Sequence, residues 1–276
     1  MLSYRHAFHA GNHADVLKHS VLVLILEYLL QKDKPFWYID THAGAGAYRL
    51  SSDEAQKNAE FAGGIGALWE QRPDALAAYF DAIAALNPQG GLEHYPGSPA
   101  FAAHLLRSQD RLRLFEMHPQ DQAVLHEHFA RDRRVQISVG DGFAGLKAVL
   151  PPPLRRALVL IDPPYELKED YQRVIDALID AQRRFANGVY MVWYPLLSRV
   201  EAQRLPERLT ALGLPALRAE LQVEEPQGEF GMYGSGVFVI NPPWTLHGQL
   251  ESWLPLLRDR LGSAVASVRL ELSGQH

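Results

Sequence analysis

The chain has 276 residues, of which 47% are hydrophobic, so it can form one large α/β domain or two smaller ones. It contains no cysteine, which excludes disulfides, thiolate metal sites and a cysteine nucleophile. The longest apolar run, residues 21–30, is interrupted by Glu27 and is too short to span a bilayer, and no basic segment with a cleavage site precedes it. We therefore expect a cytoplasmic protein without a membrane partner.

The formal net charge of −5 is unusual for a protein that binds nucleic acid by charge alone. The charge is unevenly distributed, because residues 51–96 hold seven acidic side chains and two basic ones, which leaves the rest of the chain neutral. Arg155 with Arg156 and Arg183 with Arg184 are candidates for local basic patches, although solvated surface charge more often explains such a pair.

The first predicted element is a long helix. Asn12 is expected to cap it, with Asp15 in its first turn, and apolar residues recur at helical spacing from Val16 onward. A short apolar run at residues 36–39 then ends at Asp40 and is followed by two glycines. This pattern indicates a strand that runs into a glycine loop.

Further buried strands are expected at residues 112–115, 135–139, 157–161 and 189–193, with helical patterns between most of them. Strands that alternate with helices predict an α/β fold with a doubly wound, mostly parallel sheet of the Rossmann type.

The last third of the chain predicts a helix over residues 199–212 and then two strands, at 216–223 and 236–240. These strands are expected to form a hairpin that closes the far edge of the sheet. Asn241-Pro242-Pro243-Trp244 predicts a rigid turn into a helix that begins near Leu246.

An insertion is expected between the first two strands. Glu116, at the end of the second strand, lies 72 residues after Gly44, where about 20 is typical of a nucleotide-binding unit. The surplus predicts a helical insertion at approximately residues 50–96, with helical patterns at 64–69 and 75–86, inside a single domain that spans residues 1–276. Ser98 is expected to cap the following helix, with Pro99 as its first residue.

The glycine loop does not match a dinucleotide site. The residue three positions after Gly46 is Arg49 rather than a small one, and the Asp40 carboxylate would repel a pyrophosphate. Asp40 is expected instead to meet a cationic or amine-bearing ligand, while Gly44 permits close approach of a ligand to the backbone.

Acidic residues also follow the next strands. Glu116 stands where an acid bridges ribose hydroxyls, and Asp141, which precedes Gly142, stands where an acid accepts a hydrogen bond from an adenine amine. Together with Asp162 they fall on the carboxyl edge of one parallel sheet, where folds of this type bind ligands.

Asp162-Pro163-Pro164-Tyr165 follows the buried run at residues 157–161. The Tyr165 ring can stack on a flat base, and the Asp162 carboxylate and the Pro163 carbonyl can accept hydrogen bonds from its exocyclic amine. Such acceptors localise the nitrogen lone pair, so that the amine becomes a nucleophile for an electrophilic carbon. Asp-Pro and Pro-Pro are also ordinary loop sequences, so the tetrapeptide alone leaves both interpretations open.

Several segments resemble the class I S-adenosylmethionine-dependent methyltransferases and, more narrowly, the RlmJ family of 23S ribosomal RNA adenine-N6 methyltransferases. The resemblance covers essentially the whole chain. It is carried by Met1-Leu2-Ser3-Tyr4-Arg5-His6, residues 8–19, Asp40-Thr41-His42-Ala43-Gly44-Ala45-Gly46, Tyr95-Pro96-Gly97-Ser98-Pro99, Glu116-Met117-His118-Pro119 and Asp162-Pro163-Pro164-Tyr165.

The resemblance implies a class I methyltransferase sheet, S-adenosylmethionine as cofactor, and 23S ribosomal RNA as partner. Given the modest net charge, we expect this RNA to be bound when it is naked or early in assembly. The residues implied to bind the cofactor are Lys18, His19, His42, Gly44 and Ser98 around its methionine end, Glu116 at the ribose, and Asp141 with Gly142 at the adenine. Asp162 would be the catalytic acceptor, assisted by the Pro163 carbonyl, Tyr165 would stack on the base, and Tyr4 would gate or contact the target adenosine.

Other functions remain open. A DNA adenine-N6 or a ribosomal guanine-N2 methyltransferase would also use Asp-Pro-Pro-Tyr, and an NAD-type oxidoreductase or a nucleotide-binding module without chemistry would share the sheet. His9 and His13 are four residues apart, but Gly11-Asn12 between them indicates a helix start, so we expect no metal. Nothing in the pattern demands a dimer, and a monomer is expected.

Overall fold

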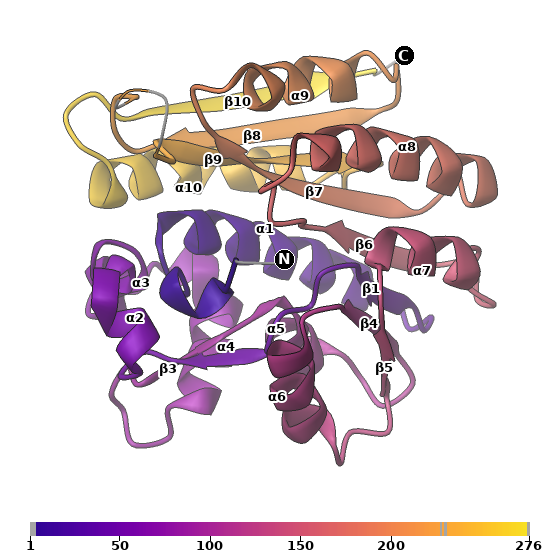
Figure 1. Ribbon diagram of the computed structural model, residues 1–276, viewed down its shortest axis with the longest axis horizontal. Coiled ribbons are helices and arrows are strands. Elements are labelled where there is room, and N and C mark those ends of the chain that lie inside the picture. Colours follow the sequence, from indigo (N-terminus) through magenta and orange to yellow (C-terminus); the bar gives the residue numbers. More distant parts are fainter. Residues whose placement is uncertain (1–3, 227, 229–230, 275–276) are drawn as a thin grey trace.

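The computed structural model describes residues 4–226, 228 and 231–274, so Met1-Leu2-Ser3 of the N-terminal motif lies outside the described residues. Eight strands form one sheet in the order β10-β8-β9-β7-β6-β1-β4-β5 (Figure 1). These strands are β1 (Trp37–Asp40), β4 (Arg111–Glu116), β5 (Val135–Val139), β6 (Ala157–Ile161), β7 (Val189–Leu196), β8 (Ala216–Gln222), β9 (Gly234–Ile240) and β10 (Ser267–Ser273).

The five adjacent strands β7, β6, β1, β4 and β5 are parallel to one another. β9 runs antiparallel to both of its neighbours, β7 and β8. The predicted α/β fold with a mostly parallel sheet and a C-terminal antiparallel strand is therefore confirmed. A separate two-stranded sheet pairs β2 (Ala47–Arg49) with β3 (His94–Pro96).

Helices cover both faces of the large sheet, which explains why all five residues of β6 are buried. Leu158 and Leu160 pack in one core cluster, and Val159 and Ile161, which alternate with them, pack in the other. The first face is covered by α1 (His13–Leu30), α5 (Ser98–Leu105), α6 (Pro119–Phe129) and α10 (Leu246–Leu261), and the second by α7 (Gly142–Val149), α8 (Lys168–Arg184) and α9 (Val200–Thr210).

Helix α1 begins as predicted, because Asn12 Oδ1 accepts hydrogen bonds from the backbone N–H groups of Ala14 and Asp15, each at 3.0 Å. A short 3₁₀ turn, η1 (His6–Phe8), precedes it. Almost every α1 side chain is buried, since the helix lies between the sheet and the segment that follows β2.

The segment between β2 and β3 is helical and lies beside α1, at the left and lower left of Figure 1. Its elements are α2 (Asp53–Asn58), η2 (Glu60–Gly63), α3 (Ile65–Trp69), η3 (Asp74–Leu76) and α4 (Ala77–Leu86). Tyr79 and Ile83 of α4 belong to the same core cluster as the apolar residues of α1. The division of the chain into one domain with an insertion stays a prediction.

The C-terminal hairpin differs from the prediction in its position. β8 and β9 do pair, but β9 lies inside the sheet between β7 and β8. Among the described residues the far edge is formed by β10, so the prediction that the hairpin closes this edge is wrong. The residues of β10 are exposed or half-buried. The strand therefore lacks the continuous apolar run that marks a buried strand.

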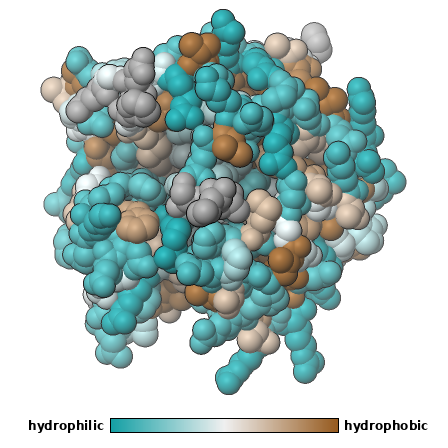
Figure 2. Space-filling view, in the orientation of Figure 1, coloured by the Kyte–Doolittle hydropathy of each residue, from teal (hydrophilic) through white to brown (hydrophobic). Residues whose placement is uncertain are grey.

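The turn predicted at Asn241 leads into α10, as expected. Asn241 has a φ of 53°, and its side-chain amide donates hydrogen bonds to the carbonyls of Ala186 and Gly188. No helix in the described ranges is both long enough and apolar enough to cross a bilayer. The face shown in Figure 2 is largely hydrophilic, with apolar residues scattered over it.

Candidate active site

A cavity of about 440 Å³ opens at the carboxyl edge of the parallel strands. The residues predicted to bind cofactor or substrate all line it: Tyr4, Lys18, His19, His42, Gly44, Ser98, Glu116, Asp141, Gly142, Asp162, Pro163 and Tyr165. The fold thus brings together side chains from α1, from the loops after four strands and from the segment that leaves the helical region. Their individual roles stay predictions.

Glu116 holds the glycine loop in place. One carboxylate oxygen accepts a hydrogen bond from Gly44 N at 2.7 Å, and the other accepts from the backbone N–H groups of Met117 and His118 at 2.8 and 2.7 Å. Burial raises the pKa of Glu116, although these N–H groups oppose the shift. Gly44 has a φ of 61°, and a Cβ there would come within 2.2 Å of the Tyr48 hydroxyl, so this position favours glycine. The predicted close approach of a ligand to Gly44 stays a prediction.

Asp141 caps α7 by accepting a hydrogen bond from Phe143 N at 3.0 Å, and it also forms an ion pair with Arg173. The Arg173 guanidinium lies 4.5 Å from the centre of the Phe143 ring. Sequence reasoning missed Arg173, because it reaches the cavity from the second turn of α8 and no motif surrounds it. His42 packs its ring against the edge of Phe143, and burial lowers its pKa to about 3, so this imidazole is neutral.

Asp40 was expected to meet a ligand, but it is fully buried behind the cavity wall, and that expectation is wrong. Its carboxylate accepts hydrogen bonds from Tyr38 Oη at 2.6 Å, Ser98 Oγ at 2.7 Å and His42 N at 3.2 Å. Burial raises the pKa of Asp40 to about 6. Ser98 is likewise not the N-cap of α5: that residue is Gly97, because the serine hydroxyl is directed back to the end of β1.

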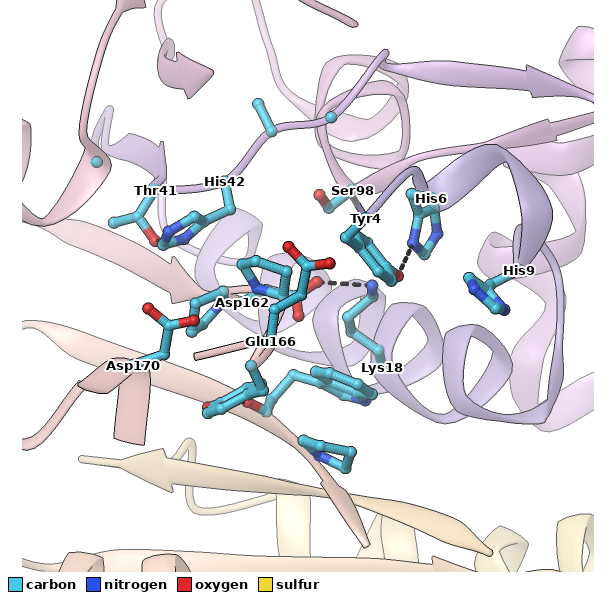
Figure 3. Close-up of a pocket in the computed structure, with 18 of the residues that line it drawn as sticks. Tyr4, His6, His9, Lys18, Thr41, His42, Ser98, Asp162, Glu166 and Asp170 are labelled. Carbon is cyan, nitrogen blue, oxygen red and sulfur yellow. Dashed lines mark hydrogen bonds and ion pairs between the residues drawn. The ribbon is translucent and has the colours of Figure 1, made fainter. Parts of the chain in front are cut away.

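A chain of buried and partly buried polar groups leads from Tyr4 to Asp162. Lys18 Nζ lies 2.7 Å from Asp162 Oδ2 and 3.0 Å from Asp15 Oδ1. His6 Nε2 lies 2.8 Å from Asp15 Oδ2, and His6 Nδ1 lies 2.8 Å from the Tyr4 hydroxyl (Figure 3). Burial opposes the charge on Lys18, but the two carboxylates raise its pKa. Lys18 was predicted from the sequence to bind the cofactor. In the structure its ammonium group lies between the carboxylates of Asp15 and Asp162.

His6 and Asp15 were not among the predicted site residues. Burial would raise the pKa of Asp15, but His6, Lys18 and His19 around it lower the pKa well below the usual value. The signal available in the sequence was the i, i+3 spacing of Asp15 and Lys18, which places both on one side of the first helix.

The loop after β6 is held in an unusual conformation. Tyr165 has a φ of 53°, which is strained for a bulky residue. Its hydroxyl donates to the carbonyl of Trp193 at 2.7 Å and its ring packs 4.8 Å from that of Tyr171, so only 2% of the residue is exposed. These contacts hold Asp162 and Pro163 at the cavity wall.

The cavity presents carboxylates, imidazoles and aromatic rings, a combination that suits a ligand rich in hydroxyl and amine donors. In the part of the chain that the structure describes, no three His, Asp or Glu side chains are grouped closely enough to hold a metal ion.

Comparison with known proteins gives a family. Residues 33–273 match the family model described as ribosomal RNA large subunit methyltransferase D, RlmJ. The chain is 49% identical to ribosomal RNA large subunit methyltransferase J of Escherichia coli strain K12 and 51% identical to the protein of that name from Haemophilus influenzae, with 95% of this chain and 94% of each relative covered.

A crystal structure of a Legionella pneumophila protein superposes with a TM-score of 0.90 at 36% identity, covering 97% of this chain and 99% of that one. The resemblance proposed from the sequence is therefore confirmed over nearly the full length. The chain belongs to the RlmJ family of ribosomal RNA large subunit methyltransferases.

Proposed function

We propose that this protein transfers a methyl group from S-adenosylmethionine to the exocyclic N6 amine of an adenosine in 23S ribosomal RNA. The observation that carries the proposal is the Asp162–Lys18 pair at the wall of the cavity, directly after a buried parallel strand. The names of the two curated relatives support ribosomal RNA of the large subunit as the substrate class.

The residues present fit the cofactor. Glu116 and Asp141 offer acceptors at the ends of β4 and β5, where ribose hydroxyls and an adenine amine would lie. At the other end of the cavity, His19 Nε2 is buried without a hydrogen-bond partner among the described residues, which leaves it for a polar ligand group. Lys18, His42, Gly44, Gly142 and Ser98 would complete the cofactor site. S-adenosylmethionine would supply a methyl group bonded to a positively charged sulfonium sulfur. Once the methyl group has been transferred, that sulfur would be part of a neutral thioether.

Asp162 and Pro163 would position the adenosine. The carboxylate and the proline carbonyl would accept the two N–H bonds of the amine, which turns its lone pair toward the methyl group. The surplus proton on the methylated nitrogen would leave toward Asp162. Tyr165 would stack on the base at the cavity wall, and Tyr4 would gate or contact the adenosine.

The preference for RNA rests on the family, whereas the preference for a naked or early assembly intermediate rests on the modest net charge. The cytoplasmic location and the monomeric state stay predictions from the sequence. Discrimination from DNA needs contacts to 2′-hydroxyl groups or to RNA shape, which the cavity residues alone do not encode.

The test incubates the purified protein with methyl-labelled S-adenosylmethionine and, separately, unmodified 23S ribosomal RNA and duplex DNA. Labelled nucleosides are then identified by mass spectrometry after digestion, with the Asp162→Asn variant as a control for contaminating activity. Label in N6-methyladenosine from RNA alone is the expected result. Label only in DNA, or on guanine N2, would overturn the proposed substrate or target atom.

A further inference from the structure

His19 occupies an unusual position at the inner end of the cavity. It lies on α1, is 1% exposed and lines the cavity together with Ser98. Its Nδ1 is 2.9 Å from the hydroxyl of Tyr95, whereas its Nε2 is buried without a hydrogen-bond partner among the described residues. A buried polar atom without a partner is costly unless a ligand completes its hydrogen bonding.

The hydroxyl of Tyr95 is the middle of a buried chain. It lies 3.1 Å from the hydroxyl of Tyr79 on α4, and both tyrosines are 0% exposed. Within the described ranges the Tyr79 hydroxyl has no other acceptor, so its proton is directed to Tyr95. Tyr95 then has its own proton to donate, and the available acceptor is His19 Nδ1.

Two further observations exclude other proton arrangements on the imidazole. Asp15 Oδ1 lies 3.9 Å from Nδ1, too far for a hydrogen bond, and the Asp15 carboxylate is already held by His6, Gly11 N and Lys18. Burial, followed by the nearby Lys18 and His6, lowers the pKa of His19 well below its usual value, although Asp15 opposes them. The ring is therefore neutral and carries one proton.

We propose that Tyr79 and Tyr95 form a hydroxyl relay that fixes His19 as the tautomer protonated on Nε2, so that this nitrogen donates to a carboxylate in the cavity. Tyr79 and Tyr95 are then positioning residues, which couple the helical segment between β2 and β3 to the ligand site. The identity of the carboxylate, the amino-acid end of S-adenosylmethionine, rests on the proposed function, whereas the tautomer does not.

The tautomer is measured directly in the ligand-free protein. Imidazole ¹⁵N spectra at pH 7.5 report which ring nitrogen bears the proton, and a His19→Gln variant assigns the signal. The expected result is a protonated Nε2 and a bare Nδ1. A proton on Nδ1, or on both nitrogens, would overturn the relay, and this outcome does not depend on which cofactor the enzyme uses.

The effect on binding is measured with two ligands, S-adenosylhomocysteine and its decarboxylated analogue. Tyr95→Phe should weaken binding of the first about tenfold, the equivalent of one hydrogen bond to a charged group, and leave the second within about twofold. Tyr79→Phe should weaken the first about threefold, because Tyr95 can then either donate or accept. Equal losses for both ligands would mean that Tyr95 is merely structural.

Tyr190→Phe is the matched control. Its hydroxyl is also buried and donates to the carbonyl of Phe185 at 2.6 Å, but it lies on the opposite face of the sheet, in the core cluster of α7 to α9. This variant should keep the affinity ratio of the two ligands. If wild-type protein bound neither ligand while His19 still carried its proton on Nε2, the proposed cofactor would fail and the relay would stand.

Discussion

β1 and β6 are neighbours in the sheet, and an aspartate stands at the end of each, yet the two carboxylates differ completely in their surroundings. Asp40 is fully buried and accepts three hydrogen bonds from Tyr38, Ser98 and His42. The Asp162 side chain is 14% exposed, faces the cavity and is paired with Lys18. The same residue type at the same edge of the sheet thus serves the scaffold in one case and remains open to a ligand in the other.

The difference follows from what covers each strand end. Gly97, which follows β3, donates its backbone N–H to the carbonyl of Gly46 in the glycine loop, and the Ser98 hydroxyl donates to Asp40. In the loop after β6, Tyr165 has a strained backbone conformation and its hydroxyl donates to the carbonyl of Trp193. Asp162, in the same loop, remains at the cavity wall. Availability for chemistry is therefore decided by burial, because Asp40 is covered by protein whereas Asp162 keeps part of its side chain at the cavity.

The largest effect is expected for Asp162→Asn. An amide replaces one acceptor oxygen of the carboxylate with a donor and has no negative charge to take up the proton, so turnover should fall about 1000-fold, while the affinity for S-adenosylhomocysteine should change less than about threefold. Single-turnover methyl transfer and calorimetry measure the two quantities. The same substitution at Asp40 is the comparison, with an expected loss of turnover below about tenfold. Near-normal turnover in Asp162→Asn would place the catalytic acceptor elsewhere.

Lys18→Met tests the buried cation between Asp15 and Asp162. Its removal takes away the cation between the two carboxylates and leaves Asp162 without its ion-pair partner, so the free energy of unfolding should fall by about 3 kcal/mol. Urea denaturation measures this change. Lys168→Met is the matched control, because Lys168 pairs with Glu201 at 2.9 Å but its side chain is 75% exposed, and the expected loss is below about 0.5 kcal/mol. Similar losses in both variants would contradict the role given to burial.

The smallest effect is expected for the stability of Asp40→Asn, and it depends on pH. At pH 5 the variant should lose about 1 kcal/mol, because one of the three donors around Asp40 meets an amide N–H. Burial raises the pKa of Asp40 to about 6, above its value of about 3.9 in an unfolded chain, so the folded state binds this proton more tightly. The stabilisation of the folded state by this proton is complete below the pKa of Asp40 in the unfolded chain. It is lost as the pH rises through about 6, the pKa of Asp40 in the folded protein.

The deficit of Asp40→Asn relative to wild type should therefore shrink between pH 5 and pH 7.5. Urea denaturation of both proteins at the two pH values gives this difference of differences, in which groups common to both proteins cancel. A deficit that grows with rising pH would mean that the buried carboxylate is stabilised in its charged form.

The sequence by itself determined the order of the elements and the chemical types at the strand ends. The all-apolar β6 and the cap at Asn12 depend on local patterns, and so do the glycine loop and the tetrapeptide at Asp162. These features are readable because periodicity, capping and turn chemistry act over a few residues.

Only the tertiary structure decided which of these groups meet. Lys18 and Asp162 are 144 residues apart and His19 and Tyr95 are 76 apart, and nothing local specifies either contact. Arg173 and the edge strand β10 escaped prediction for the same reason, since one is an isolated charge on a helix and the other a half-exposed strand. Burial, partner number and proton position arise when distant segments pack, and they separate the scaffold carboxylate at Asp40 from the one at Asp162.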